Sequence, residues 1–285
     1  MQVLSAHPRQ KTGFSACEPL PCRLGQISFM NSLPVVLPIE RGYVPLDAEV
    51  VLASPARLNA LFAQGALDIG AMSSFYYLSQ DNLTLVPGLS ISCLGPVGSV
   101  LFFARVSPPE LSGKKILVSS QSATSVNLLK ILLLEHYGVE PLFIACDEPD
   151  LVLADVSGAL IIGDRALGLD EVWEGRFYRQ DLGQWWHETY DLPMVFGLWA
   201  ARSEWVEGNP EKFEEISAAL VLAKKLGLSE LFASVLSESG RRSGLSQSRL
   251  EGYFRGQLNF ELSQGHFSGL SLYRSLCAKY NLFGS

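Results

Sequence analysis

Two apolar runs with strand character, about a hundred residues apart, constrain the fold of this chain more than any other feature. "SVLFFAR" covers residues 99–105 and "PMVFGLWAAR" covers 193–202, and both end in arginine. Strand and helix patterns alternate between the two runs, and a similar alternation precedes the first. Strands that alternate with helices of about 10–15 residues indicate mainly parallel sheets. We therefore expect an α/β chain in which a second lobe is inserted into the first, with a hinged cleft between them.

The division into lobes follows from these two runs. Residues 23–98 and 203–285 are expected to form the first lobe, and 99–202 the second. The stretch "NSLPVVLPIERG" (31–42) predicts a proline-punctuated loop with a helical turn. Residues 83–95 are expected to form an extended segment that is interrupted by a proline. The other expected elements are strands at 23–29, 48–54, 67–75, 114–120, 141–146 and 159–164, and helices at 55–65, 122–137, 182–190 and about 209–239, 246–258 and 263–280.

Composition and charge narrow the class of partner. Of the 285 residues, 48% are hydrophobic and 18% charged, which is typical of a compact globular chain. The 22 basic and 29 acidic residues give a net charge of −7, which argues against a nucleic-acid partner. No apolar run reaches the roughly 18 residues of a membrane span, so no membrane partner is expected. An anionic ligand would have to be bound by local dipoles.

Residues 1–22 are expected to be a disordered extension. Basic residues are followed by "FSAC" (14–17), which looks like a lipoprotein cleavage site, but the run of about 7–15 apolar residues that a secretory signal needs is missing. We therefore expect a cytoplasmic protein with reduced thiols. The four histidines are scattered, and no metal or cofactor site is expected. The five irregularly spaced cysteines are Cys17, Cys22, Cys93, Cys146 and Cys277.

A cluster of hydroxyl side chains marks a strand-to-helix corner in the second lobe. Five serines and threonines occur within "SSQSATS" (119–125), between an apolar strand and a helix pattern. The free N–H groups and positive dipole end of a helix bind anions without a cationic side chain. Ser122, Thr124 and Ser125 are therefore candidates for binding a carboxylate. Ordinary helix capping is the alternative.

Further candidates lie at other expected strand ends. Asn31 follows an apolar strand, and its amide can both donate and accept, although an Asx-turn is the alternative. Ser73 and Ser74 end the third strand. Gly98 and Ser99 lie at the start of "SVLFFAR", the first of the two apolar runs, where the chain is expected to cross from one lobe to the other. Small residues there let the backbone approach a ligand.

Gly163 and Asp164 end a strand of the second lobe. Asp164 is a candidate carboxylate, but helix capping beside Arg165 explains it equally well. No nucleotide-binding glycine motif, P-loop or nucleophile elbow is present. No histidine lies at a strand end, so a histidine general base has no candidate. The tryptophans expected in the core or the cleft wall are Trp185, Trp186 and Trp199.

Six motifs follow one another in unbroken order: "RLGQISFMNSLP", "ALDIGAMSSFYYL", "LSISCLGPVGSVLFFAR", "SATSVNLLKILL", "ALIIGDRAL" and "LPMVFGLWAAR". Together they closely resemble the MqnA family, the chorismate dehydratases of the futalosine route to menaquinone. The resemblance begins near Arg23 and implies a two-lobed type II periplasmic-binding-protein-like fold. The sister family MqnD, a lyase that acts on cyclic de-hypoxanthine futalosine, has a histidine where this chain has Gly163, which favours the dehydratase.

The resemblance implies loss of water from chorismate to give 3-[(1-carboxyvinyl)oxy]benzoate. The substrate is a small dicarboxylate, and Asn31 matches an asparagine that the family is thought to use in catalysis. A non-catalytic solute-binding protein of the same fold and the MqnD-type lyase remain the alternatives. The residues expected to bind the substrate are Ser73, Ser74, Gly98, Ser99, Ser122, Thr124, Ser125 and Asp164.

Overall fold

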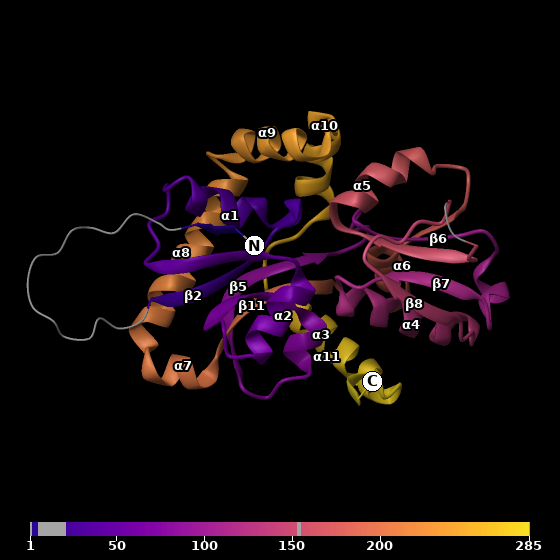
Figure 1. The fold of residues 1–285 in the computed structure, drawn as a ribbon, viewed down its shortest axis with the longest axis horizontal. Coiled ribbons are helices and arrows are strands. Elements are labelled where there is room, and N and C mark those ends of the chain that lie inside the picture. Colours follow the sequence, from indigo (N-terminus) through magenta and orange to yellow (C-terminus); the bar gives the residue numbers. More distant parts are fainter. Residues whose placement is uncertain (1, 5–20, 153–154, 285) are drawn as a thin grey trace, which may run out of the picture.

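Two mixed sheets, each flanked by helices, divide the molecule into two lobes (Figure 1). The computed structural model describes residues 2–4, 21–152 and 155–284. In this part of the chain the first sheet has the strand order β1-β3-β2-β4-β11-β5, and the second has β10-β6-β9-β7-β8. The strands are β1 (Gln2–Leu4), β2 (Cys22–Ile27), β3 (Ala48–Ala53), β4 (Ile69–Ser73), β5 (Leu83–Cys93), β6 (Val100–Ala104), β7 (Lys115–Ser119), β8 (Leu142–Cys146), β9 (Gly158–Ile162), β10 (Tyr178–Asp181) and β11 (Met194–Arg202).

The first sheet has a parallel centre with antiparallel additions. β2 pairs in parallel with β3 and β4, as predicted for strands joined through helices. β11 runs antiparallel between β4 and β5, and β1 runs antiparallel beside β3. Residues 2–4 thus form a strand in the segment expected to be disordered, because the edge of β3 offers unpaired backbone groups. Residues 1 and 5–20 of that segment, Cys17 included, lie outside the described residues.

The boundary predicted for the second lobe needs one correction. β6 belongs to the second sheet, as expected, but β11 belongs to the first. The predicted range 99–202 therefore contains a strand of the first sheet. An apolar extended run fits the middle of either sheet, so its composition does not specify the neighbouring strands.

Helices cover both sheets. In the helix Ala123–Tyr137, Leu128, Leu129 and Leu132 are buried. Trp185, Trp186 and Trp199 lie in the core, as predicted. The longer helical elements are α1 (Leu33–Glu40), α2 (Pro55–Ala63), α3 (Ser74–Leu78), α4 (Ala123–Tyr137), α5 (Gly163–Val172), α6 (Leu182–Tyr190), α7 (Ser203–Gly208), α8 (Pro210–Leu228), α9 (Phe232–Ser243), α10 (Gln247–Gly252), the π-helical turn η3 (Tyr253–Gln257) and α11 (Gln264–Lys279). The 3-10 turns are η1 (Met30–Ser32), η2 (Pro108–Leu111) and η4 (Leu282–Gly284).

Helix α1 replaces most of the predicted loop at 31–42. Pro34 stands in its first turn, where a missing N–H costs nothing, but Pro38 lies inside the helix. Burial of Val35 and Leu37 in the core outweighs the hydrogen bond lost at Pro38. Similarly, β5 continues through Pro87 because β5 is an edge strand, where proline is tolerated.

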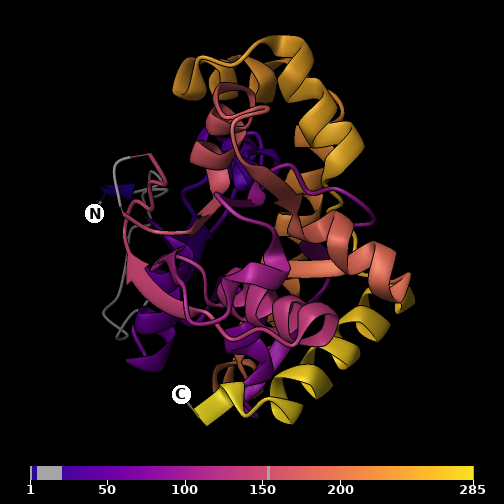
Figure 2. The ribbon, with the colours of Figure 1, turned by 90° about the vertical axis from the view of Figure 1, so that its right-hand side faces the viewer.

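The helices after Ser203 run along the outside of the molecule (Figure 2). α8 packs on α1 and β5, and α9 packs on α1 and α8, all elements of the first lobe. α11 contacts β11 and α3 and also touches α4 of the second lobe. The helix predicted at 209–239 is divided, since α8 ends at Leu228 and α9 begins at Phe232. Among the described residues, no helix combines the length and the apolar character needed to cross a bilayer.

Candidate functional site

A cavity of about 50 Å³ lies where strand ends of the two sheets face each other. Its walls are largely apolar and include Phe29, Ile162 and Phe196. No charged side chain is among the residues that line it in the described part of the chain. The polar side chains in its lining are Asn31, Ser73, Ser99, Ser122 and Ser125.

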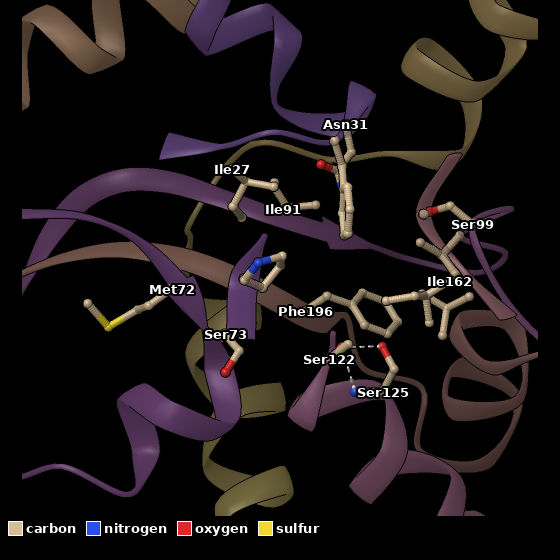
Figure 3. Close-up of a pocket in the computed structure, with 16 residues that line it drawn as sticks. Ile27, Asn31, Met72, Ser73, Ile91, Ser99, Ser122, Ser125, Ile162 and Phe196 are labelled. Carbon is tan, nitrogen blue, oxygen red and sulfur yellow. Dashed lines mark hydrogen bonds between the residues drawn. The ribbon is translucent and has the colours of Figure 1, made fainter. Parts of the chain in front are cut away.

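Asn31 enters the cavity from η1, directly after β2. Its Oδ1 atom is buried and accepts no hydrogen bond from the described residues. An Asx-turn would give this oxygen a backbone N–H partner, so the geometry differs from that alternative. A buried acceptor left without a partner is costly, and such atoms often mark functional positions. Figure 3 shows Asn31 on the opposite side of the cavity from Ser122 and Ser125, with the ring of Phe196 between them.

Ser73 reaches the cavity from the end of β4, where it caps helix α3. Its Oγ accepts from Tyr76 N at 3.2 Å and from Asn59 Nδ2 at 3.0 Å. With both acceptor positions used, the hydroxyl proton of Ser73 is available to a ligand oxygen. Ser74 does not line the cavity, although its Oγ is buried and has no partner among the described residues.

The hydroxyl corner before α4 contributes two of its three predicted residues. Ser122 caps the helix: its Oγ accepts from Ser125 N at 3.2 Å and donates to Ser125 Oγ at 2.9 Å. The N–H groups of Ala123 and Thr124 donate to no group in the described part of the chain. These N–H groups, the Ser125 proton and the positive end of α4 form a site suited to an anion.

Thr124 does not line the cavity. Successive side chains of a helix point about 100° apart, which turns Thr124 away from the face that carries Ser122 and Ser125. Its Oγ1 accepts from Phe75 N at 3.0 Å, and its carbonyl accepts from Tyr273 OH at 3.0 Å. Thr124 therefore joins the two lobes.

Residues 94–99 connect β5 to β6 and cross from the first lobe to the second; we call this segment the crossing. Gly98 and Ser99 end it, and of the two only Ser99 lines the cavity. Gly98 has φ +70°, a conformation that favours glycine, and an added Cβ would lie 2.2 Å from Gln257 Oε1, so the Gln257 side chain would have to move. Asp181 fixes this turn by accepting from Gly98 N at 2.7 Å and Val97 N at 3.0 Å.

Asp181 is a positioning residue that the sequence reasoning missed. Its carboxylate also caps α6 through Gly183 N at 2.9 Å and Gln184 N at 3.1 Å. Burial raises its pKa, although the N–H groups of Val97, Gly98 and Gln184 oppose that shift. An aspartate directly before "LGQWWHETY" was visible as a helix cap, but its second contact, with the crossing, was not.

Asp164 also lies behind the cavity, whereas its neighbour Gly163 lines it. The Asp164 carboxylate accepts from Met30 N at 3.0 Å and so links α5 to the turn that carries Asn31. Burial raises the pKa of Asp164. The structure thus brings together Asn31, Ser73, Ser99, Ser122 and Ser125, and it leaves Ser74, Gly98, Thr124 and Asp164 in the surrounding layer.

The arrangement suits a small anionic molecule with an apolar ring. It provides hydroxyl protons, one amide and a helix N-terminus between apolar walls, which favours orientation of a ligand over strong acid–base chemistry. Within the described ranges, no three His, Cys, Asp or Glu side chains gather closely enough to hold a metal ion.

Comparisons with known proteins agree with this arrangement. A family model described as menaquinone biosynthesis matches residues 22–279. The chorismate dehydratase of Thermus thermophilus is 35% identical over 219 residues, which span 72% of this chain and 78% of that protein.

Two solved structures show the fold. A protein from Archaeoglobus fulgidus has a TM-score of 0.71 at 18% identity and covers 91% of this chain and 97% of its own. The periplasmic aliphatic sulphonate binding protein SsuA from Escherichia coli has a TM-score of 0.63 at 16% identity, with coverages of 94% and 95%. The predicted periplasmic-binding-protein-like fold is confirmed.

Proposed function

Because this chain belongs to the menaquinone biosynthesis family, we propose that it is a chorismate dehydratase, a carbon–oxygen lyase. The observation that carries the proposal is the 35% identity to a protein named chorismate dehydratase. The cavity supports it, because a ring with two carboxylates fits apolar walls with hydroxyl donors at their edges.

The reaction removes one water from the ring of chorismate. The C–H bond breaks at the ring carbon that carries the enolpyruvyl ether, and the C–O bond breaks at the neighbouring carbon that carries the hydroxyl. The electron pair of the C–H bond completes the aromatic ring, and the departing hydroxide leaves as water with one proton. A substrate carboxylate accepts the ring proton, and this proton leaves with the departing hydroxide, so the carboxylate is regenerated and the protein need not supply a strong base. Binding the dianion in a reactive pose then contributes most of the catalysis.

The described residues divide this task by position. Ser122, Ser125 and the first turn of α4 hold one carboxylate, and Ser73 and Ser99 direct protons toward other substrate oxygens. The Asn31 amide orients the enolpyruvyl group or polarises the departing hydroxyl.

Substrate entry is expected to involve movement of the lobes. The links from Thr124 to Phe75 and from Asp164 to Met30 cross the junction between the lobes. Re-forming these links after substrate binding would exclude water from the reacting ring.

The direct test is to incubate purified protein with chorismate and to follow the aromatic product by absorbance and mass. Cyclic de-hypoxanthine futalosine, offered in parallel, tests the MqnD-type alternative. The Thermus thermophilus relative serves as the positive control. If it converts chorismate while this protein leaves chorismate unchanged, the proposal is refuted. We also propose a cytoplasmic location, and cell fractionation that finds the protein in the periplasm would instead favour a solute-binding role.

Asn31 provides the sharpest test of the site. Asn31→Ala should lower turnover by about a hundredfold, the scale of losing one oriented donor in an active site. Asn31→Asp should be equally damaging, because it removes the NH₂ donors and places a negative charge beside a dianion. Both variants should melt within a few degrees of the parent, since Asn31 supports little core packing. Near-normal turnover in Asn31→Asp would remove Asn31 from the mechanism.

A further inference from the structure

A buried tyrosine outside the cavity contacts one of the hydroxyls that line it. The Tyr253 hydroxyl donates to Ser99 Oγ at 3.0 Å. The two residues are 154 positions apart and belong to different parts of the fold: Ser99 precedes β6, and Tyr253 begins the π-helical turn η3. Ser99 lines the cavity, but Tyr253 does not.

We propose that Tyr253 is a positioning residue that directs the Ser99 hydroxyl proton into the cavity, toward a carboxylate or ether oxygen of the bound dicarboxylate. This inference rests on the function proposed above. A serine hydroxyl has one donor and two acceptor positions. When Tyr253 occupies an acceptor position, the rotation of the Ser99 hydroxyl is restricted and its proton remains free for a ligand. A hydroxyl that accepts one hydrogen bond also becomes a stronger donor in the next.

The surroundings hold Tyr253 in this role. Its side chain is 1% exposed and packs against Phe254, with ring centroids 5.3 Å apart. Burial raises the pKa of Tyr253, so the hydroxyl keeps the proton that it donates. π-helical turns are rare and occur frequently at functional sites.

A second residue of the same turn lies beside the residue that precedes Ser99. Gln257 occupies the space where a side chain at Gly98 would lie, and its Oε1 accepts from Arg249 Nη1 at 3.1 Å. The turn η3 therefore lies against the crossing at two successive residues, with Gln257 beside Gly98 and the Tyr253 hydroxyl on Ser99.

A double-mutant cycle tests the inference. Tyr253→Phe removes the hydroxyl and keeps the ring packing. It should lower kcat/KM for chorismate by about five- to tenfold, the effect of one lost hydrogen bond. Ser99→Ala should cause a larger loss, and adding Tyr253→Phe to it should cause no further loss, because Tyr253 then has no hydroxyl to orient. Tyr190→Phe is the matched control, since the Tyr190 hydroxyl is buried without a partner among the described residues, and it should leave turnover unchanged.

The possible outcomes separate this inference from the proposed function. If Tyr253→Phe has no effect, or has the same effect with and without Ser99, Tyr253 acts through packing or not at all, and the inference is overturned. If the parent protein leaves chorismate unchanged, the proposed function fails, and the same cycle is measured on the affinity for isophthalate as a probe dicarboxylate. An isophthalate affinity that depends on Tyr253 only when Ser99 is present supports the inference, and any other pattern overturns it.

Discussion

Single residues at this site differ in role although the sequence places them together. Ser122, Thr124 and Ser125 share one helix start, yet the Thr124 hydroxyl is used between the lobes while the two serines face the cavity. Asp164 shows the same division from its neighbour Gly163. Its carboxylate accepts from Met30 N and supports the turn that carries Asn31.

The raised pKa of Asp164 predicts a pH-dependent stability difference. A carboxyl whose pKa is higher in the folded than in the unfolded state stabilises the fold below the unfolded pKa, and this contribution is lost as the pH rises through the folded value. Asp164→Asn cannot ionise, so the melting temperature of the variant minus that of the parent should be greater at about pH 8 than at about pH 4, by a few degrees.

Activity of the same variant distinguishes support from catalysis. The amide oxygen of Asp164→Asn still accepts from Met30 N, so turnover should fall by no more than about threefold. Asp164→Ala lacks an acceptor at this position, so its turnover should fall further than that of Asp164→Asn. A folded Asp164→Asn protein without turnover would show that Asp164 acts as an acid or base.

At the scale of elements, the packing of α1 on α8 supports the turn that carries Asn31. α1 follows η1 directly, so a shift of α1 moves Asn31. The two helices approach closely where Gly227 lies against Pro34: a Cβ built on Gly227 would be 2.0 Å from Pro34 O.

Gly227→Ala should therefore destabilise the protein. The backbone of Pro34 would have to move, and such overpacking costs about 1–3 kcal/mol. Gly168→Ala is the matched control, because Gly168 lies in α5 with nothing within 4 Å of an added Cβ. It should stabilise the protein by about 0.5–1 kcal/mol through helix propensity. Urea unfolding of the parent and both variants checks the prediction. If the two variants unfold at the same urea concentration, the prediction is wrong.

At the scale of the whole molecule, the net charge of the protein opposes the approach of an anionic substrate, whereas the groups in the cavity favour its binding. The chain carries −7 and the proposed substrate is a dianion, so long-range repulsion opposes their encounter. The attractive groups, hydroxyl protons and the α4 N-terminus, act only at short range inside the cavity.

Salt should therefore raise the rate of encounter. Increasing KCl from about 20 to about 200 mM shortens the Debye length below about 10 Å and screens the repulsion, while buried contacts are screened less. We expect kcat/KM for chorismate to rise by about twofold, with kcat unchanged at saturating substrate. A decrease of kcat/KM with salt would show that a local positive potential dominates instead.

Much of the architecture was determined by local sequence. Hydrophobic periodicity and helix-end signals predicted β2, β3, β7 and α6 closely, because period and caps depend on residues near in the chain. The same local patterns predicted that serine and threonine hydroxyls and the Asn31 amide lie at strand ends. The ordered motifs predicted the family and the fold. Five of the nine predicted site residues line the cavity.

Tertiary structure alone decided how these pieces are used. It placed β11 in the first sheet, formed α1 across Pro38, directed the Thr124 hydroxyl to Phe75 and brought Tyr253 to Ser99. Each outcome depends on a partner far away in the sequence. A residue's own neighbours fix its period and its cap, but the direction of a side chain and the neighbour of a strand are set by packing between distant segments.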